Sequence, residues 1–325
     1  MWKTKVCELL GIKYPILEGG MAIAGNPELA AAVSDAGGLG MLGSNPGKVI
    51  PEKREENLRN CIKKIKKLTD KPFGVNIPIY ADPETSKNLL ESAIEEGVKV
   101  IATSGGNPAL LTPRIKEAGC KSIHVISNRK QAKKAEAIGV DIIVAEGYEA
   151  GGANSPDEIT TFVMIPTIVD EVNVPVVAAG GIGDARGFIA ALALGAEGVQ
   201  MGSRFIVTKE CHAHPNFKKA IIEANDTDTV ITRRAIGRRV RSLKNDFVNK
   251  ILELDRRCAI DEMKIFIGQG RAKEGQLLGD TKNGEMSIGQ ISGNIDDILS
   301  AQQVIDNIVN NAEKVIKKCL DFCQS

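Results

Sequence analysis

Two short apolar strands in tandem, each ending in a glycine turn, limit the fold of this chain more than any other feature. They occupy residues 176–184 and 198–205, and their turns contain Gly180, Gly181, Gly202 and Ser203. Glycines at the carboxyl end of a strand let the backbone approach an anion, and nearby N–H groups then bind it. Two such turns side by side are typical of the last two strands of a (β/α)8 barrel, where they bind a phosphate group. A pair of ordinary turns is the alternative interpretation.

Six further apolar runs that end in small or polar residues complete a set of eight. They are residues 15–21, 40–44, 73–77, 98–104, 122–127 and 141–147. Helical stretches separate the runs, at 27–36, 52–68, 84–96, 108–118, 129–138, 159–172 and 185–194. Strands that alternate with helices pair in parallel, and nearly continuous apolar strands are buried on both faces. We therefore predict an α/β fold, a closed (β/α)8 TIM barrel, in preference to an open doubly wound sheet.

The sequence changes character after the eighth strand. Residues 206–285 show no strand rhythm and carry charged helical patterns, whereas 301–320 repeat apolar residues at the spacing of a buried helix. This predicts a barrel formed by 1–205 and 286–325, with a helical substrate or lid domain at 206–285 inserted before the last helix. The basic stretch 233–257 is interpreted as a solvated helix face, or as a site for the phosphates of NAD(P)H, coenzyme A or an acyl carrier protein.

Charge and composition narrow the classes of partner. The 42 Lys and Arg residues nearly balance the 41 Asp and Glu residues, so no overall field favours nucleic acid or an acidic membrane. No run of about 18 apolar residues predicts a membrane span, and the first residues lack the apolar core of a signal peptide. The seven cysteines are scattered and never spaced as CxxC, which predicts reduced thiols and a cytoplasmic location. No set of metal ligands at a typical spacing is present.

The carboxyl ends of the eight strands are where this fold carries its active site. Small residues at six of these ends leave room for a broad, flat ligand, and FMN fits with its phosphate on the two glycine turns. The amides of Asn76 and Gln200 are suited to hydrogen-bond the edge of a flavin ring. Alternatively, Asn76 caps a turn and Glu146 forms a surface salt bridge. The predicted cofactor-binding residues are Gly20, Met21, Ala22, Asn76, His124, Glu146, Gly151, Gly152, Gly180, Gly181, Gln200, Met201, Gly202 and Ser203.

Five motifs, in order, resemble those of the nitronate monooxygenase (2-nitropropane dioxygenase-like) family. They are Glu-Gly-Gly-Met-Ala at 18–22, Pro-Phe-Gly-Val-Asn at 72–76, Glu-Gly-Tyr-Glu-Ala-Gly-Gly at 146–152, Ala-Ala-Gly-Gly-Ile at 178–182 and Gln-Met-Gly-Ser-Arg-Phe at 200–205. The resemblance extends from residue 15 to about residue 293. It implies a (β/α)8 barrel, tightly bound FMN and an inserted domain that covers the flavin. The family also includes flavin-dependent enoyl-acyl-carrier-protein reductases and NAD(P)H:quinone reductases.

One departure from the family pattern affects the chemistry. Members with nitronate or enoyl chemistry typically carry a histidine directly after the Gly-Gly pair, over the flavin, whereas this chain has Ala153. Alanine cannot transfer a proton. The candidates for its role are His124, His214, Asn154 and Ser155.

These four candidates differ in what they can do. Asn154 and Ser155 can orient a substrate, but neither is a base near neutral pH. His124, at the end of the fifth strand, is expected to point toward the cofactor region or to be a satisfied core residue. His214 is expected to hinge the insert onto the active site, and His212 is expected at the surface.

The predicted function is therefore that of an FMN-dependent oxidoreductase that oxidises alkyl nitronates through its flavin. The alternative is an NAD(P)H-dependent reductase of enoyl thioesters or quinones, with NAD(P)H as electron donor and an acyl thioester as substrate. A more distant alternative is a barrel without flavin that binds a sugar phosphate, which would need a catalytic Lys or Glu pair where only Glu146 stands. The expected partners are small molecules rather than nucleic acid or membrane, and a homodimer is compatible with these features.

Overall fold

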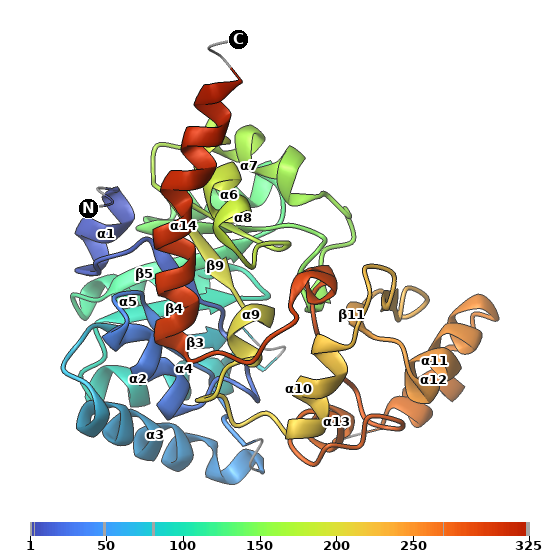
Figure 1. The fold of residues 1–325 in the computed structure, drawn as a ribbon. Coiled ribbons are helices and arrows are strands. Elements are labelled where there is room, and N and C mark those ends of the chain that lie inside the picture. The colour runs from blue at the N-terminus through green and yellow to red at the C-terminus, as the bar shows by residue number, and fades with distance from the viewer. Residues whose placement is uncertain (1, 3, 48–49, 80–81, 269, 323–325) are drawn as a thin grey trace.

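Eight parallel strands form a closed barrel in the computed structural model, which describes residues 2, 4–47, 50–79, 82–268 and 270–322. The barrel strands are β1 (Ile16–Glu18), β2 (Gly40–Leu42), β3 (Phe73–Pro78), β4 (Val100–Ser104), β5 (Lys121–Ile126), β6 (Ile142–Glu146), β8 (Val176–Ala179) and β9 (Gly198–Met201). Their order in the sheet is β1-β9-β8-β6-β5-β4-β3-β2, and a parallel bridge between Leu17 and Leu39 closes it. The predicted TIM barrel is confirmed (Figure 1).

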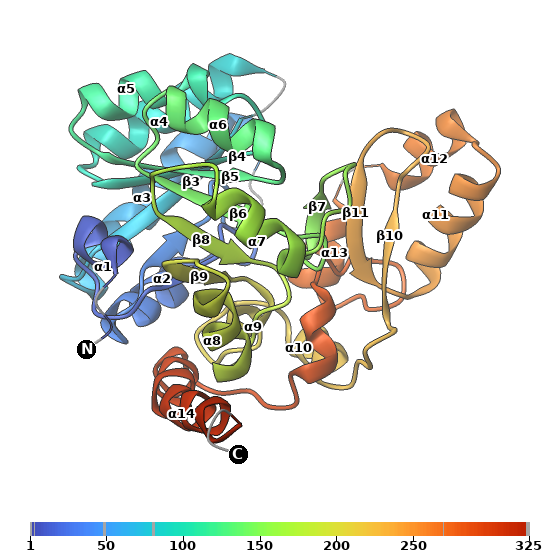
Figure 2. The same ribbon diagram turned by 90° about the horizontal axis from the view of Figure 1, so that it is seen from above.

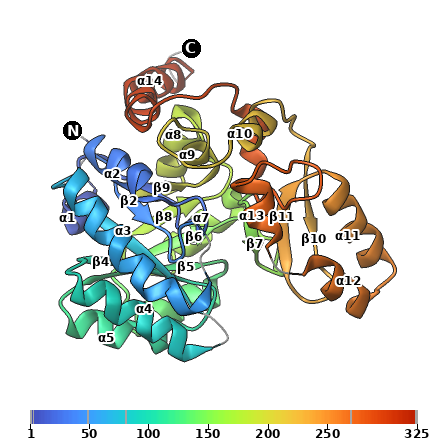
Figure 3. The same cartoon turned by 90° about the horizontal axis from the view of Figure 1, so that it is seen from below.

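The helices surround the barrel as the alternating pattern predicts. They are α2 (Pro27–Asp35), α3 (Arg54–Leu68), α4 (Pro83–Glu95), α5 (Thr112–Glu117), α6 (Arg129–Ala137), α7 (Thr161–Val169), α8 (Ala185–Ala193) and α14 (Ala301–Asp321). The last of these, α14, buries Val304, Ile305 and Ile308 and lies beside α8 and α2 (Figure 3). It begins at a capping box in which the Ser300 hydroxyl accepts from the Gln303 backbone N–H. None of the described helices has the length and apolar character needed to cross a membrane.

Each barrel strand has an inner and an outer face, because successive side chains of a strand point to opposite sides. The inner face is apolar and carries Leu17, Met41, Ile123, Val144 and Val177. Val6 and Leu10 of α1 (Lys5–Leu10) belong to the same cluster, so this helix plugs one end of the barrel. The outer face packs against the surrounding helices. This alternation decides which strand residues can reach the opposite, open end of the barrel.

The insert is mixed rather than purely helical. It contains α10 (Pro215–Ile222), β10 (Thr229–Thr232), β11 (Arg239–Leu243), α11 (Asp246–Arg256), α12 (Ile260–Ile267) and α13 (Arg271–Gln276). β10 pairs with β11, and β11 pairs with β7 (Gly152–Asn154), all antiparallel. Figure 2 shows this small sheet with α11 and α12 at one side of the barrel. The expectation of helices alone is therefore wrong at 229–243, where the basic stretch begins as a hairpin instead of a helix face.

Candidate active site

The two glycine turns lie next to each other at the carboxyl ends of β8 and β9, and Gly181 and Gly202 leave room for a side chain, whereas Gly180 is closely packed. Gly180 and Gly181 have φ values of 95° and 73°, a left-handed conformation that favours glycine. At Gly202 the backbone is right-handed, yet an added Cβ would meet only the Met21 sulfur, at 3.8 Å. At Gly181 the nearest atom would be the Glu149 Cβ at 3.4 Å. Side chains would fill this space, so the turns form a cradle suited to a phosphate group.

Hydrogen bonds from the segment that follows the insert hold the second turn in place. The Gly289 N–H donates to the Ser203 hydroxyl at 3.0 Å, and the Gln290 N–H donates to the Glu149 carbonyl at 2.9 Å. An added Cβ on Gly151 would lie 2.6 Å from the Gly289 nitrogen, so only glycine permits this approach. These contacts bring the loop after β6 and the segment after the insert to the second glycine turn.

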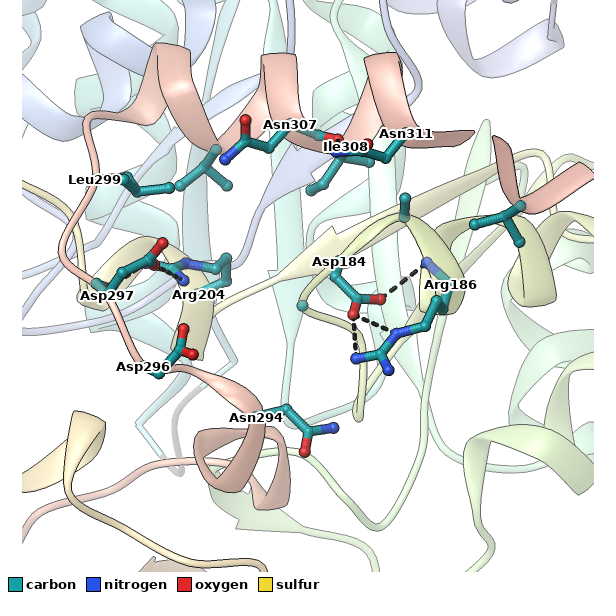
Figure 4. A pocket seen from close by; sticks show the side chains of 14 residues that line it. Asp184, Arg186, Arg204, Asn294, Asp296, Asp297, Leu299, Asn307, Ile308 and Asn311 are labelled. Atoms are coloured by element: carbon teal, nitrogen blue, oxygen red, sulfur yellow. Dashed lines mark hydrogen bonds and ion pairs between the residues drawn. The ribbon is translucent and has the colours of Figure 1, made fainter. Parts of the chain in front are cut away.

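The residue after this turn, Arg204, anchors it from behind. Its buried guanidinium pairs with the Asp297 carboxylate at 2.7 Å (Figure 4) and also donates to the Val207 and Asp297 carbonyls. Beside it, a cavity of about 420 Å³ lies between α8 and α14. Arg204 and Asn307 line this cavity, which is thus on the outer side of the barrel. The turns are therefore fixed from behind and open toward the barrel mouth.

Two amides face the barrel mouth, where a flavin ring would lie. Asn76 and Gln200 share their strand faces with Gly74 and Gly198, respectively, opposite to the outward-facing Val75 and Val199. Asn76 lies within β3 and does not cap a turn, and it accepts a hydrogen bond of 3.4 Å from Ser104. An added Cβ on Gly20 would lie 2.4 Å from the Asn76 Cβ, so the β1 loop packs directly against this amide.

Glu146 is the acidic side chain at the mouth. It ends β6 on the same face as the interior residues Ile142 and Val144. Its side chain is partly buried, and its carboxyl has no ion-pair or hydrogen-bond partner among the described residues. Glu146 therefore does not form the surface salt bridge that was the alternative. Burial raises the pKa of its carboxyl to about 7. This group therefore exchanges its proton near neutral pH.

His124 does not point toward the barrel mouth, and that expectation is wrong. Its neighbours on β5, Ile123 and Val125, face the barrel interior, so His124 lies on the outer face. There it is 3% exposed, and its Nδ1 lies 2.7 Å from the hydroxyl of Thr103. Burial lowers its pKa to about 4, so the imidazole is neutral at physiological pH. His124 is thus a satisfied core residue, the second of the two roles considered for it.

The other three candidates have structural hydrogen bonds. The Nδ1 of His214 accepts from the Asn216 N–H at 3.1 Å and thereby caps α10. The Asn154 amide donates to the Ala150 and Gly152 carbonyls at 2.8 and 3.2 Å. The Ser155 hydroxyl accepts from the Asp157 N–H at 3.2 Å in a local turn. His212 is exposed beside Glu28, as expected.

Arginines of the insert connect it to the loop after β6. Arg241 is 3% exposed, donates to the Tyr148 carbonyl at 2.9 and 3.1 Å, and stacks over the Tyr148 ring. Arg234 and Arg239 both pair with Glu158. Because these partners are far apart in the sequence, no local signal could have identified them. The first part of the basic stretch therefore docks the insert and is not left to bind phosphates.

Glu149 is a supporting residue that sequence reasoning missed. Its carboxylate accepts from the Thr161 N–H at 3.0 Å, and the Thr161 hydroxyl lies 2.9 Å from the Gly180 carbonyl, to which it donates. This chain of bonds connects the loop after β6 with the first glycine turn. Glu149 lies inside one of the five motifs, which was the only available signal.

Comparison with known proteins agrees with this geometry. The family model "Nitronate monooxygenase" matches residues 3–311. A probable nitronate monooxygenase of Staphylococcus saprophyticus is 32% identical, with 97% of this chain and 99% of the relative aligned. A Rhodococcus jostii relative, named as a (3aS,4S,5R,7aS)-5-hydroxy-7a-methyl-1-oxo-octahydro-1H-indene-4-carboxyl-CoA dehydrogenase, is 32% identical over 97% of both chains. The solved structure of FabK from Thermotoga maritima has a TM-score of 0.92 and 40% identity, covering 99% of this chain and 100% of that one.

Proposed function

This chain belongs to the nitronate monooxygenase family and is a flavin-dependent oxidoreductase, and from this premise we propose that it carries FMN and oxidises anionic alkyl nitronates. The observation that carries the proposal is the barrel mouth itself, where an open pair of glycine turns lies beside inward-facing amides while Ala153 offers no base. A nitronate has already lost its α-proton, so its oxidation needs no base over the ring.

The cradle at the two turns supports FMN as the form of the flavin. The backbone at Gly180, Gly181, Gly202 and Ser203 would hold the phosphate, since a Cβ at Gly202 would occupy otherwise open space. The amides of Asn76 and Gln200 would hydrogen-bond the ring edge. When bound, FMN supplies the electron transfer, and the side chains at the mouth orient the substrate and exclude water.

The domain boundaries are part of the same proposal. We propose that 1–205 and 286–325 form the FMN-binding barrel and that 206–285 act as a lid over the flavin. The pairing of β11 with β7 and the Arg241 contact with Tyr148 support a docked lid. We also propose a cytoplasmic homodimer. Free thiols in the described part of the chain, such as those of the buried Cys7, Cys120 and Cys211, support the location, and the exposed Phe162 and Val163 of α7 support the dimer.

A second candidate function is the NAD(P)H-dependent reduction of an enoyl thioester. Two similarities favour it: the Rhodococcus jostii relative is named for a coenzyme A thioester, and the 40% identity to FabK, an enoyl-ACP reductase, exceeds the 32% identity to the probable nitronate monooxygenase of Staphylococcus saprophyticus. Hydride transfer to an activated alkene also needs no carbon-acid base, so the absence of histidine at Ala153 is compatible with it.

Parallel assays of the purified protein test the two functions. The cofactor is released and identified by mass analysis, and oxygen consumption with nitrite release is followed with ethylnitronate and with neutral nitroethane. NADH consumption is followed with crotonyl-CoA in the same preparation. The proposal predicts FMN and faster turnover of ethylnitronate than of nitroethane. Turnover of crotonyl-CoA with no nitrite from ethylnitronate would select the second function.

A further inference from the structure

Glu146 is the one titratable side chain that the described carboxyl ends of the barrel strands turn inward. The neighbouring strands β5 and β8 present Val125 and Ala179 on this face, and its polar groups include the amides Asn76 and Gln200 and the Ser104 hydroxyl. None of these five residues carries a charge. Glu146 is thus an isolated carboxyl among the described inward-facing residues at these strand ends.

The charged groups of the adjoining loop are already engaged elsewhere. In the loop after β6, the Tyr148 hydroxyl accepts from Arg234 at 2.6 Å, and the Glu149 carboxylate accepts from Thr161 at 3.0 Å. Arg241 of the insert is bound to the Tyr148 carbonyl. Among the described residues, no cation pairs with Glu146 to stabilise its ionised form, and loss of water raises its pKa to about 7.

We propose that Glu146 acts in the barrel mouth as a neutral carboxylic acid that donates a hydrogen bond to an anionic substrate. A negative charge at this position would repel a nitronate at short range in a water-poor site, whereas a protonated carboxyl donates a hydrogen bond to one of its oxygens. A flavin ring over the mouth would remove further water and keep the group neutral to higher pH. Glu146 thereby favours anions with an O–N–O head. The choice of nitronate as substrate rests on the proposed function, but the protonation of Glu146 does not.

The first experiment measures the protonation of Glu146 without any turnover. Infrared difference spectra of the flavin-free protein are recorded as the pH is raised, because only a protonated carboxyl absorbs in the carbonyl region above the amide band. We expect one band that disappears as the pH passes about 7 and that is missing in Glu146→Gln. Glu18→Gln is the matched control, because Glu18 is fully buried with a strongly raised pKa but lies outside the mouth, bound to the Met41 N–H. That variant should keep the titrating band.

The second experiment measures anion binding to the FMN-loaded protein. Nitrate serves as an inert planar probe, and its dissociation constant is read from the perturbed flavin spectrum between pH 6 and pH 10. In the wild type the constant should be flat at low pH and then rise about tenfold per pH unit above the pKa of Glu146, as a single linked proton requires. Glu146→Gln should bind as tightly as the wild type at low pH and show no pH dependence. Glu146→Ala should bind about ten- to hundredfold more weakly at pH 6, because the donor is lost.

Three results would overturn the proposal. One is a nitrate affinity that changes neither with pH nor on the Glu146→Ala substitution. Another is loss of nitrate binding in Glu146→Gln to the same extent as in Glu146→Ala. This result would mean that nitrate binding needs the titratable proton of a carboxyl and that an amide donor cannot replace it. The third is loss of FMN from Glu146→Ala alone, which would make the cofactor the acceptor. Failure of the proposed function would look different: nitrate would bind as described, but ethylnitronate would not be oxidised.

Discussion

Replacement of Gly202 by valine separates binding of the cofactor phosphate from folding. Gly202 has φ −101° and ψ −63°, which any residue adopts, and an added Cβ would contact only the Met21 sulfur at 3.8 Å. The unfolding free energy of flavin-free Gly202→Val should therefore change by less than about 1 kcal/mol. The valine side chain would occupy the phosphate position. Losing two charge-assisted hydrogen bonds costs about 3–6 kcal/mol, which weakens FMN binding by roughly 10²- to 10⁴-fold.

The assay is a titration of flavin-free protein with FMN, followed by quenching of flavin fluorescence, with thermal unfolding measured on the same samples. Gly181→Ala and Gly119→Ala form a matched pair, because their φ values are 73° and 69°. Both should lose about 1–2 kcal/mol of stability from left-handed strain. Gly119 lies in the turn before β5, away from the cradle, so only Gly181→Ala should also weaken FMN binding. Wild-type FMN affinity in Gly202→Val would refute the assignment of the cradle.

Three further predictions address the loop, the histidine and the insert. Ala153→His should raise the rate with neutral nitroethane by about 10²-fold or more, because it adds a base over the mouth; an unchanged rate with every substrate would mean that this loop does not cover the flavin. The pKa of His124 is lowered to about 4, so the unfolded chain binds a proton on this residue more readily than the folded protein does. The free energy of unfolding should therefore keep its full value above about pH 6.5 and fall by up to about 3 kcal/mol as the pH drops toward 4. His124→Asn should lack this dependence in urea unfolding, and an equal pH profile in both proteins would contradict it. Arg241→Ala should speed amide hydrogen exchange in β7 and β11 while the barrel strands stay protected, because the buried guanidinium donates to Tyr148; unchanged exchange would show that other contacts dock the insert.

The barrel was predictable because its signals are local. Each strand is a short apolar run with a small residue at its end, and the two glycine turns stand in sequence where the phosphate cradle forms in space. The inward position of Asn76 and Gln200 agrees with the roles expected of them, which remain predictions until a cofactor is identified. Burial of β5 on both faces also made it impossible to predict whether His124 points into the barrel or away from it. A strand that is apolar on both sides shows no alternation, so its phase cannot be read from the sequence.

The insert was harder to predict for a different reason. β10 has only four residues, two of them threonines, and β11 has five, two of them arginines that interrupt its apolar pattern. Their partners, Tyr148 and Glu158, lie about 80 to 90 residues earlier in the chain, in the loop after β6. Arginine in a charged segment usually indicates a solvated surface, whereas here Arg241 is buried by a carbonyl and a tyrosine ring. Only the tertiary structure brings these groups together.

Anaerobic mixing of the purified, FMN-loaded protein with ethylnitronate tests the central claim most directly. The absorption of oxidised flavin is followed over time, with neutral nitroethane and buffer as parallel controls. If the mouth accepts anionic nitronates and passes their electrons to a flavin held by the two glycine turns, ethylnitronate should bleach the absorption rapidly, whereas nitroethane should do so slowly or not at all. A protein that carries stoichiometric FMN but is not bleached by ethylnitronate would contradict the account.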